Sequence, residues 1–213
     1  MDTQDDLKFK CVHCGNCCIN PKIIVNLSYR DVLRIKKGLN LNLDELLEII
    51  GFYIFTDKLN KDKKEKMVIP PLKTERGLSY MALIKDKTGA CIFYDFDKKR
   101  CKIYKLRPNF CRTFPFFFFY YTFKENSQKL NIAITEKGKE LCLGLSKDAL
   151  PINKANWFDL GKEVLEDLKL NAEFINQMNL ILKKEKINPS AKEFLRNIIK
   201  LDESMRDQNN SSN

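Results

Sequence analysis

The stretch Cys11-Val12-His13-Cys14-Gly15-Asn16-Cys17-Cys18 contains four of the eight cysteines in this chain of 213 residues. A thiolate is a soft ligand, and closely spaced cysteines let one loop wrap a zinc ion or an iron–sulfur cluster. The remaining cysteines lie in the middle of the chain: Cys91, Cys101, Cys111 and Cys142. We expect all eight to be metal ligands, with the middle segment folding back onto the N-terminal loop.

The spacing Cys11-x2-Cys14-x2-Cys17 matches the first three ligands of a bacterial ferredoxin, whose fourth ligand comes from elsewhere in the chain. It favours an iron–sulfur cluster of the 4Fe–4S kind over zinc, although Cys11-x2-Cys14 alone also matches half of a zinc site. Neighbouring side chains normally diverge, so Cys18 is expected to serve a second centre or a different role from Cys17. The eight thiols can form two four-thiolate centres, or one centre and a reactive pair, and the spacing leaves both open.

Other enzyme classes find little support in the sequence. The single histidine, His13, lies between two candidate ligands, where a side chain usually points away from the metal, and one histidine is too few for a His-rich catalytic zinc site. No G-x-G-x-x-G or P-loop occurs among the eight glycines, which argues against a dinucleotide or nucleoside triphosphate site and a conventional methyl-donor loop. Whether the protein is an enzyme stays open.

Composition bears on location and partners. Residues 1–6 are acidic and lack the apolar segment of a secretory signal, and no run of about 18 apolar residues exists. We therefore expect a cytoplasmic protein with no membrane partner, whose reduced thiols favour metal ligation over disulfides. The net charge of +10 raises the possibility of nucleic-acid binding. The lysines are scattered, however, and anionic thiolate centres would lower this charge, so nucleic acid is disfavoured, while a protein partner or substrate stays open.

Two short helices are expected within residues 28–51. Capping-box-like starts occur at Ser28 and Asn42, and glycines at Gly38 and Gly51 are expected to end the helices. Apolar residues recur between these signals at helical spacing.

Short strands are expected before and after these helices. Their expected positions are residues 23–25, 79–85, 91–94 and 101–104, with a hairpin joining 79–85 to 91–94. Residues 56–78 are expected to form an irregular loop. The aromatic run from Phe114 to Tyr121 is expected as a strand paired with residues 129–135. Because that run is apolar on both faces, burial in the core is favoured over base stacking.

The predicted fold class is α+β: a small cysteine-rich core of antiparallel strands and hairpins, with flanking helices. Residues 1–150 are expected to form the metal-binding domain. Residues 151–206 are expected to add a helical pair without cysteines, serving as scaffold or partner surface, and residues 207–213 to form a disordered tail.

Taken in order, several motifs resemble one known family. They are the N-terminal cysteine loop, Gly89-x-Cys91, Cys101-x-Ile103-Tyr104-x2-Arg107-Pro108-x2-Cys111-Arg112-x-Phe114-Pro115, and Cys142-x-Gly144. Over about residues 9–146 the chain resembles the YkgJ-like cysteine-cluster family, a zinc- or iron-chelating domain. The resemblance implies metal or cluster binding through the eight cysteines. That family also includes a flagellin lysine N-methylase branch, so a protein-modifying enzyme is an alternative, and a basic nucleic-acid-associated binder is a second alternative.

Three further residues are candidates for the surroundings of the sulfurs. Arg107 and Arg112 are permanently charged donors, which beside thiolates would offset negative charge and raise the potential of a cluster. They could instead bind an anionic substrate, or make no specific contact. Tyr104 could donate its hydroxyl to a sulfur or simply pack, and packing is favoured. The predicted function is metal binding through an iron–sulfur cluster, zinc or both, with a redox or cluster-dependent role.

Overall fold

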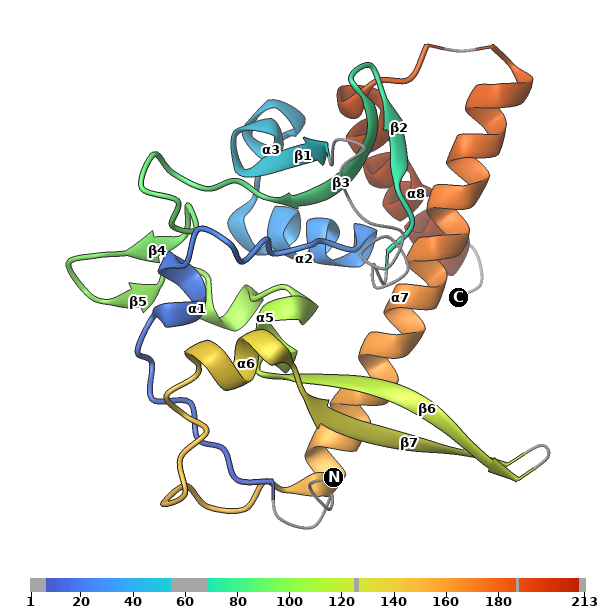
Figure 1. Cartoon of the computed structure of the whole chain (residues 1–213). Helices are drawn as coiled ribbons and strands as arrows, with labels where there is room; N and C mark the ends of the chain where they lie inside the picture. The colour runs from blue at the N-terminus through green and yellow to red at the C-terminus, as the bar shows by residue number, and fades with distance from the viewer. Residues whose placement is uncertain (1–6, 55–68, 125–126, 187, 211–213) are drawn as a thin grey trace. The chain divides into compact units, whose positions relative to one another are not determined.

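The computed structural model describes residues 7–54, 69–124, 127–186 and 188–210 (Figure 1). The chain divides into two compact units: unit 1 combines residues 1–23 and 85–167, and unit 2 combines residues 24–84 and 168–213. The long helix α7 (Lys154–Lys184) contributes residues to both units. Helices occur together with short antiparallel sheets, so the predicted α+β class is confirmed. All eight cysteines belong to unit 1.

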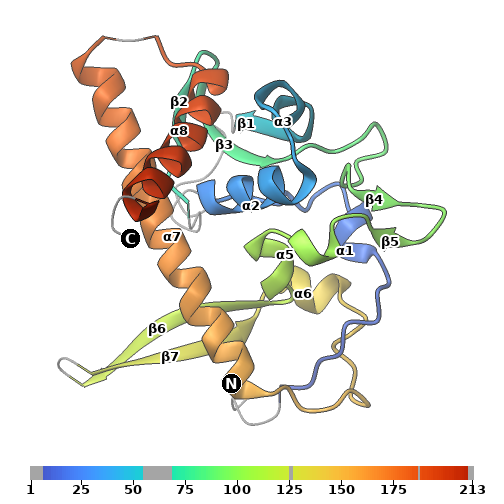
Figure 2. The same ribbon diagram turned by 180° about the vertical axis from the view of Figure 1, so that it is seen from behind.

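Unit 1 contains two antiparallel strand pairs, β4 with β5 and β6 with β7. Its elements, apart from the start of α7, are α1 (Asn16–Ile19), β4 (Tyr94–Asp95), β5 (Arg100–Cys101), a 3-10 turn (Tyr104–Leu106), α5 (Asn109–Thr113), β6 (Phe116–Lys124), β7 (Ser127–Ile134) and α6 (Glu136–Leu141). Figure 2 shows the same ribbon from behind. The predicted pairing of the aromatic run with the strand after it is confirmed, because Phe116 lies opposite Ile134 and the register continues along both strands.

The core of unit 1 is built on one face of β6. Phe116 and Phe118 are buried against Leu7 and Ile132, and the Trp157 ring of α7 lies 4.8 Å from the Phe116 ring between centroids. The prediction that the aromatic run is buried on both faces is wrong. Side chains alternate across a strand, and the large exposed ones in this run are Phe117, Phe119, Tyr120 and Tyr121.

The hairpin predicted between residues 79–85 and 91–94 is also wrong. Strand β3 (Gly77–Leu83) already pairs with β1 on one edge and with β2 on the other. Residues 91–94 therefore do not pair with it as a strand. Only one bridge forms between the two segments, at Lys85 and Cys91. The hairpin forms one turn later, where β4 pairs with β5.

Unit 2 has a three-stranded antiparallel sheet in the order β1-β3-β2. Its elements are α2 (Tyr29–Leu39), α3 (Leu43–Ile49), β1 (Ile50–Ile54), β2 (Leu72–Thr74), β3, the later part of α7, and α8 (Ala191–Asn210). The sequence reading missed β1 and β2. Part of the loop expected at 56–78, residues 56–68, lies outside the described residues. Residues 23–25 form no strand of their own, although the Leu83 nitrogen donates to the Val25 oxygen at 3.0 Å.

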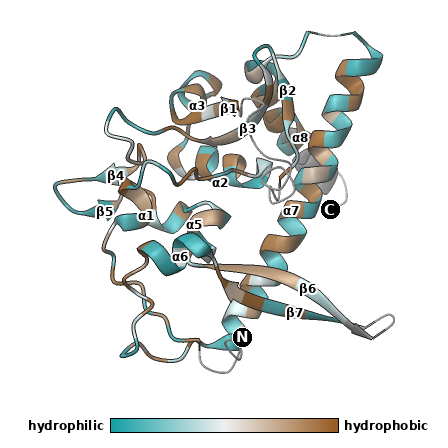
Figure 3. Ribbon diagram, viewed as in Figure 1, coloured by the Kyte–Doolittle hydropathy of each residue, from teal (hydrophilic) through white to brown (hydrophobic). Residues whose placement is uncertain are grey.

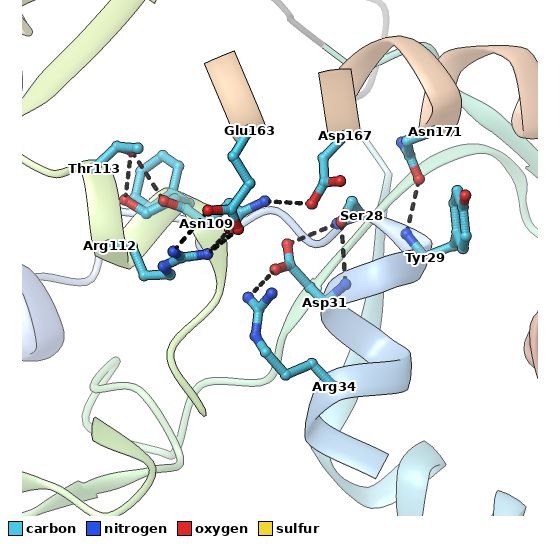
Figure 4. Close-up of polar contacts among 11 residues, drawn as sticks. Ser28, Tyr29, Asp31, Arg34, Asn109, Arg112, Thr113, Glu163, Asp167 and Asn171 are labelled. Carbon is cyan, nitrogen blue, oxygen red and sulfur yellow. Dashed lines mark hydrogen bonds and ion pairs between the residues drawn. The ribbon is translucent and has the colours of Figure 1, made fainter. Parts of the chain in front are cut away.

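The two predicted capping boxes of unit 2 are confirmed. Ser28 accepts from the Asp31 nitrogen at 3.1 Å, and Asp31 accepts from the Ser28 nitrogen at 3.0 Å (Figure 4). Asn42 makes the same reciprocal contacts at the start of α3. The predicted helix ends at Gly38 and Gly51 are wrong. Helix α2 continues through Gly38 to a left-handed Asn40, and Gly51 lies inside β1, where the Ile50 cap already follows an extended path.

The predicted C-terminal helical pair is present as α7 and α8. Figure 3 shows hydrophobic and hydrophilic bands alternating along α7, as an amphipathic helix requires. Within unit 2, Asn171 of α7 accepts from the Tyr29 nitrogen at 2.9 Å (Figure 4). The segment expected as a tail from residue 207 begins inside α8, which runs to Asn210. In the described part of the chain, no helix is long and apolar enough to cross a membrane.

Candidate metal centre

The N-terminal cysteine loop is sharply bent. His13 and Gly15 both have positive φ, of 53° and 79°, and α1 begins at the next residue, Asn16. The Tyr94 ring fills the space beside Gly15, where an added Cβ would lie 2.4 Å from the Tyr94 hydroxyl oxygen. The bend therefore gathers the loop against β4. Its cysteines differ in exposure: Cys11 is exposed, and Cys14, Cys17 and Cys18 are partly buried.

Backbone hydrogen bonds hold the middle cysteines against this loop. The Cys91 nitrogen donates to the Cys18 oxygen at 2.8 Å, which places a buried cysteine directly beside the loop. Cys101 lies opposite Tyr94 in the β4–β5 pair. Cys111 comes from α5, whose first turn is closed by a 2.9 Å hydrogen bond from the Cys111 nitrogen to the Pro108 oxygen.

The segment around Cys142 packs along the same loop. The Asn16 side chain donates to the Leu141 oxygen at 3.1 Å, and the Lys10 nitrogen donates to the Gly144 oxygen at the same distance. The predicted convergence of the middle segment on the N-terminal loop is therefore present in unit 1. Asn16 and Leu141, which meet there, lie 125 residues apart in the chain.

Four of the thiols influence one another in every pairing, and we call Cys17, Cys18, Cys91 and Cys111 the four-thiol group. Hydrogen bonding to Cys17 raises the pKa of Cys18, and the charges of Cys17, Cys111 and Cys91 raise it further. Burial raises the pKa values of Cys91 and Cys111 above the ordinary 9.0, and the charge of Cys17 adds to both. The charge of Cys91 also acts on Cys111. Without a cation, these thiols oppose one another's ionisation.

The adjacent sulfurs of Cys17 and Cys18 do not diverge, contrary to the expectation from their adjacency. They lie 3.9 Å apart and share a hydrogen bond. This bond lowers the pKa of Cys17 to about 7, against the opposing effect of burial. Both cysteines belong to the short helix α1.

The other four cysteines lie around this group. Burial raises the pKa of Cys101, and the charge of Cys17 adds to it. The charge of Cys101 in turn raises the pKa values of Cys91 and Cys111. Burial likewise raises the pKa of Cys142, and the charges of Cys14 and Cys17 add to it. Cys11 is the exposed member. Among the described residues, no three Cys, His, Asp or Glu side chains are close enough together to form a ready-made coordination shell.

Two cations act on the thiols, and the sequence reading named only one of them. The positive charge of Arg107 partly offsets the effects that raise the pKa values of Cys101 and Cys111. The missed cation is Lys85, whose Nζ donates to the Asn20 and Gly89 oxygens at 2.8 Å each. Its charge likewise lowers the pKa of Cys91 against the effect of burial. No motif spacing marks Lys85, because its place beside Cys91 comes from a single bridge.

The remaining predicted neighbours have other contacts. The Arg107 guanidinium lies 3.8 Å above the Tyr104 ring, and the His13 ring lies 5.1 Å from that same ring. Arg112 contacts the Glu163 carboxylate through two nitrogens, at 2.6 and 3.1 Å, and also donates to Asn109 at 2.9 Å (Figure 4). Tyr104 therefore packs as favoured, while Arg112 has an acidic partner on α7.

The comparisons with known proteins agree with this arrangement. A family model named CxxCxxCC, described as "Putative zinc- or iron-chelating domain", matches residues 10–142, a range that includes all eight cysteines. An uncharacterized protein of Methanocaldococcus jannaschii, MJ0661, is 28% identical over 111 residues, which cover 52% of this chain and 46% of that protein. The chain thus spans about half the length of this curated relative. No solved structure matches the chain.

Proposed function

The chain belongs to the CxxCxxCC family, and from that premise we propose that its four-thiol group binds one metal ion, zinc, as a tetrathiolate centre. The observation that carries this is the 3.9 Å approach of the Cys17 and Cys18 sulfurs, beside a backbone hydrogen bond that holds Cys91 against Cys18. The electrostatic influence of Cys111 on Cys18, and of Cys17 on Cys111, adds the fourth thiol. Thiolates gathered in a desolvated place repel one another, and a divalent cation that replaces their protons removes this cost. Since the described residues form no ready-made coordination shell, the proposal requires the four side chains to move when the ion binds.

The spacing of the adjacent sulfurs favours a shared metal atom. Two thiolates on one tetrahedral zinc, with bonds of about 2.3 Å, lie about 3.8 Å apart. The Cys17 and Cys18 sulfurs are 3.9 Å apart. A 4Fe–4S cluster takes one cysteine for each iron, so the pair supports zinc over the cluster that the spacing of the N-terminal loop favours.

An iron–sulfur cluster is the second candidate, because two cations lie near the thiols. Arg107 and Lys85 would offset the negative charge of a cluster and raise its reduction potential. Either centre suits a reducing compartment such as the cytoplasm, where the eight thiols stay free.

Metal and acid-labile sulfide analysis of anaerobically purified protein tests the assignment. A colourless protein with about one zinc per chain and no sulfide is expected. A brown protein that contains sulfide and absorbs at about 400 nm would contradict zinc and support the iron–sulfur cluster. A protein that retains neither metal after loading and desalting would reject both.

Zinc affinity is expected to rise steeply with pH. Since the pKa values of Cys18, Cys91 and Cys111 are raised and that of Cys17 is about 7, zinc added at pH 8 must displace about three protons. Each released proton strengthens apparent binding up to about tenfold per pH unit. Proton release into weak buffer and zinc competition between pH 6.5 and 8.5 measure both quantities. Affinity that is independent of pH would contradict the thiol ligands.

Lys85→Met is expected to weaken zinc binding about tenfold, since partners outside the ligand shell typically contribute about 10–100-fold. The change removes the charge that lowers the pKa of Cys91 and the two hydrogen bonds to Asn20 and Gly89. Lys87→Met is the matched control, because Lys87 is an exposed lysine of the same turn. Equal loss in both variants would show that only net charge matters.

A further inference from the structure

One face of the β6–β7 ribbon carries a row of exposed aromatic side chains. Phe117, Phe119 and Tyr121 point to the same side of β6, and they are 45%, 39% and 54% exposed. The Phe117 and Phe119 rings are stacked, with centroids 5.5 Å apart and an interplanar angle of 25°. We call these three residues the aromatic row. The row is exposed aromatic surface that the metal centre does not use.

The ribbon is anchored from its other face. Phe116 and Phe118 are buried in the core of unit 1, where the Trp157 ring lies 4.8 and 6.4 Å from their rings. Helix α7 approaches β6 so closely that a Cβ at Gly161 would lie 2.5 Å from the Phe118 ring. The aromatic row is therefore held in place by buried neighbours on the same strand, so little ordering is needed when a ligand binds.

The ribbon is basic as well as aromatic. Strands β6 and β7 contain no acidic residue and include Lys124 and Lys129. Lys129 is exposed and lies opposite Tyr121 in the strand register, so it belongs to the face of the aromatic row. The chain as a whole carries a net charge of +10.

We propose that the aromatic row binds single-stranded nucleic acid, with bases stacking on Phe117, Phe119 and Tyr121 and with Lys129 contacting a phosphate. Rings presented on a strand, next to cations, are the features that sequence-tolerant single-strand binders use. An apolar protein surface would instead have to desolvate the Lys129 ammonium, and would gain nothing from the positive charge. The sequence favoured core burial over base stacking because this run is apolar on both faces, and in the structure one face is exposed.

Fluorescence anisotropy of the full-length, metal-loaded protein tests the surface. The probes are labelled oligo(dT) and oligo(U) of about 12 nucleotides, a length within the site sizes of single-strand binders. Phe119→Ala is expected to weaken binding roughly five- to a hundredfold, the range of one lost base stack. Phe119→Trp is expected to preserve binding. Lys129→Gln is expected to lower the slope of log affinity against log salt by about 0.7.

Tyr120→Ala is the matched control, because Tyr120 is 52% exposed on the same strand and points to the opposite face. Its affinity for both probes is expected to stay within about twofold of the unchanged protein. Zinc content and circular dichroism, measured on every variant, separate lost binding from lost folding. The aromatic row would be overturned as a nucleic-acid site if neither probe bound at low salt, or if the Phe119 and Tyr120 variants lost equal affinity. It would also be overturned if light scattering showed that Phe119→Ala splits a dimer while the affinity for oligonucleotides stays unchanged.

Discussion

Cys91→Ser and Cys111→Ser are each expected to weaken zinc binding on the order of a hundredfold or more, whereas Cys11→Ser is expected to keep the original affinity. Both lost thiols belong to the four-thiol group, in which each sulfur interacts with the other three. A structural zinc site contributes about 10–16 kcal/mol in all, so losing one of four thiolates should weaken binding on the order of a hundredfold or more. Cys11, in contrast, is exposed to solvent.

Competition with a chromophoric chelator measures these affinities. Serine differs from cysteine by one atom, and circular dichroism of the metal-free variants checks that the fold survives. Cys101→Ser gives an internal comparison, because Cys101 interacts with Cys17, Cys91 and Cys111 and could replace Cys18 as the fourth ligand. Loss of metal in Cys11→Ser together with retention in Cys111→Ser would mean that the ferredoxin-like spacing, and not the four-thiol group, defines the ligands.

The sequence predicted best what depends on local chemistry. The capping boxes at Ser28 and Asn42 need only residues three apart, so they could be read directly. The family and its eight cysteines could be read for a related reason, since residue types and short spacings carry the signal. Strand pairing could not be read in this way. Gly51 has the appearance of a helix stop, yet it pairs with Ala82, a partner that no local pattern indicates.

Which cysteines lie close together could also not be predicted without the fold. Adjacency argues that Cys17 and Cys18 diverge, but the turn of α1 leaves their sulfurs 3.9 Å apart. The contact between Cys18 and Cys91 is a backbone hydrogen bond across more than 70 residues of sequence. The pattern of side chains along the sequence does not predict such a bond. The aromatic run shows the same limit. A strand that is apolar at every position gives no alternation from which to read an exposed face.

Gly15→Ala is expected to destabilise the metal-loaded protein by about 2–5 kcal/mol and to weaken zinc binding by at least about tenfold. The φ of Gly15 is +79°, which costs an L-residue about 1–2 kcal/mol. An added Cβ would also lie 2.4 Å from the Tyr94 hydroxyl oxygen and 2.8 Å from its ring carbon. Overpacking of this kind costs about 1–3 kcal/mol, and here the ring or the cysteine loop must move.

Two further variants separate these causes. Gly77 has a φ of +111° with nothing within 4 Å of its would-be Cβ, so Gly77→Ala measures backbone strain without a clash. It is expected to lower stability in urea unfolding by about 1–2 kcal/mol and to leave zinc affinity unchanged. Combining Gly15→Ala with Tyr94→Ala removes the clashing ring and should recover part of the lost zinc affinity. If Gly15→Ala weakened zinc binding no more than Gly77→Ala does, the shape of the cysteine loop would have no part in holding the metal.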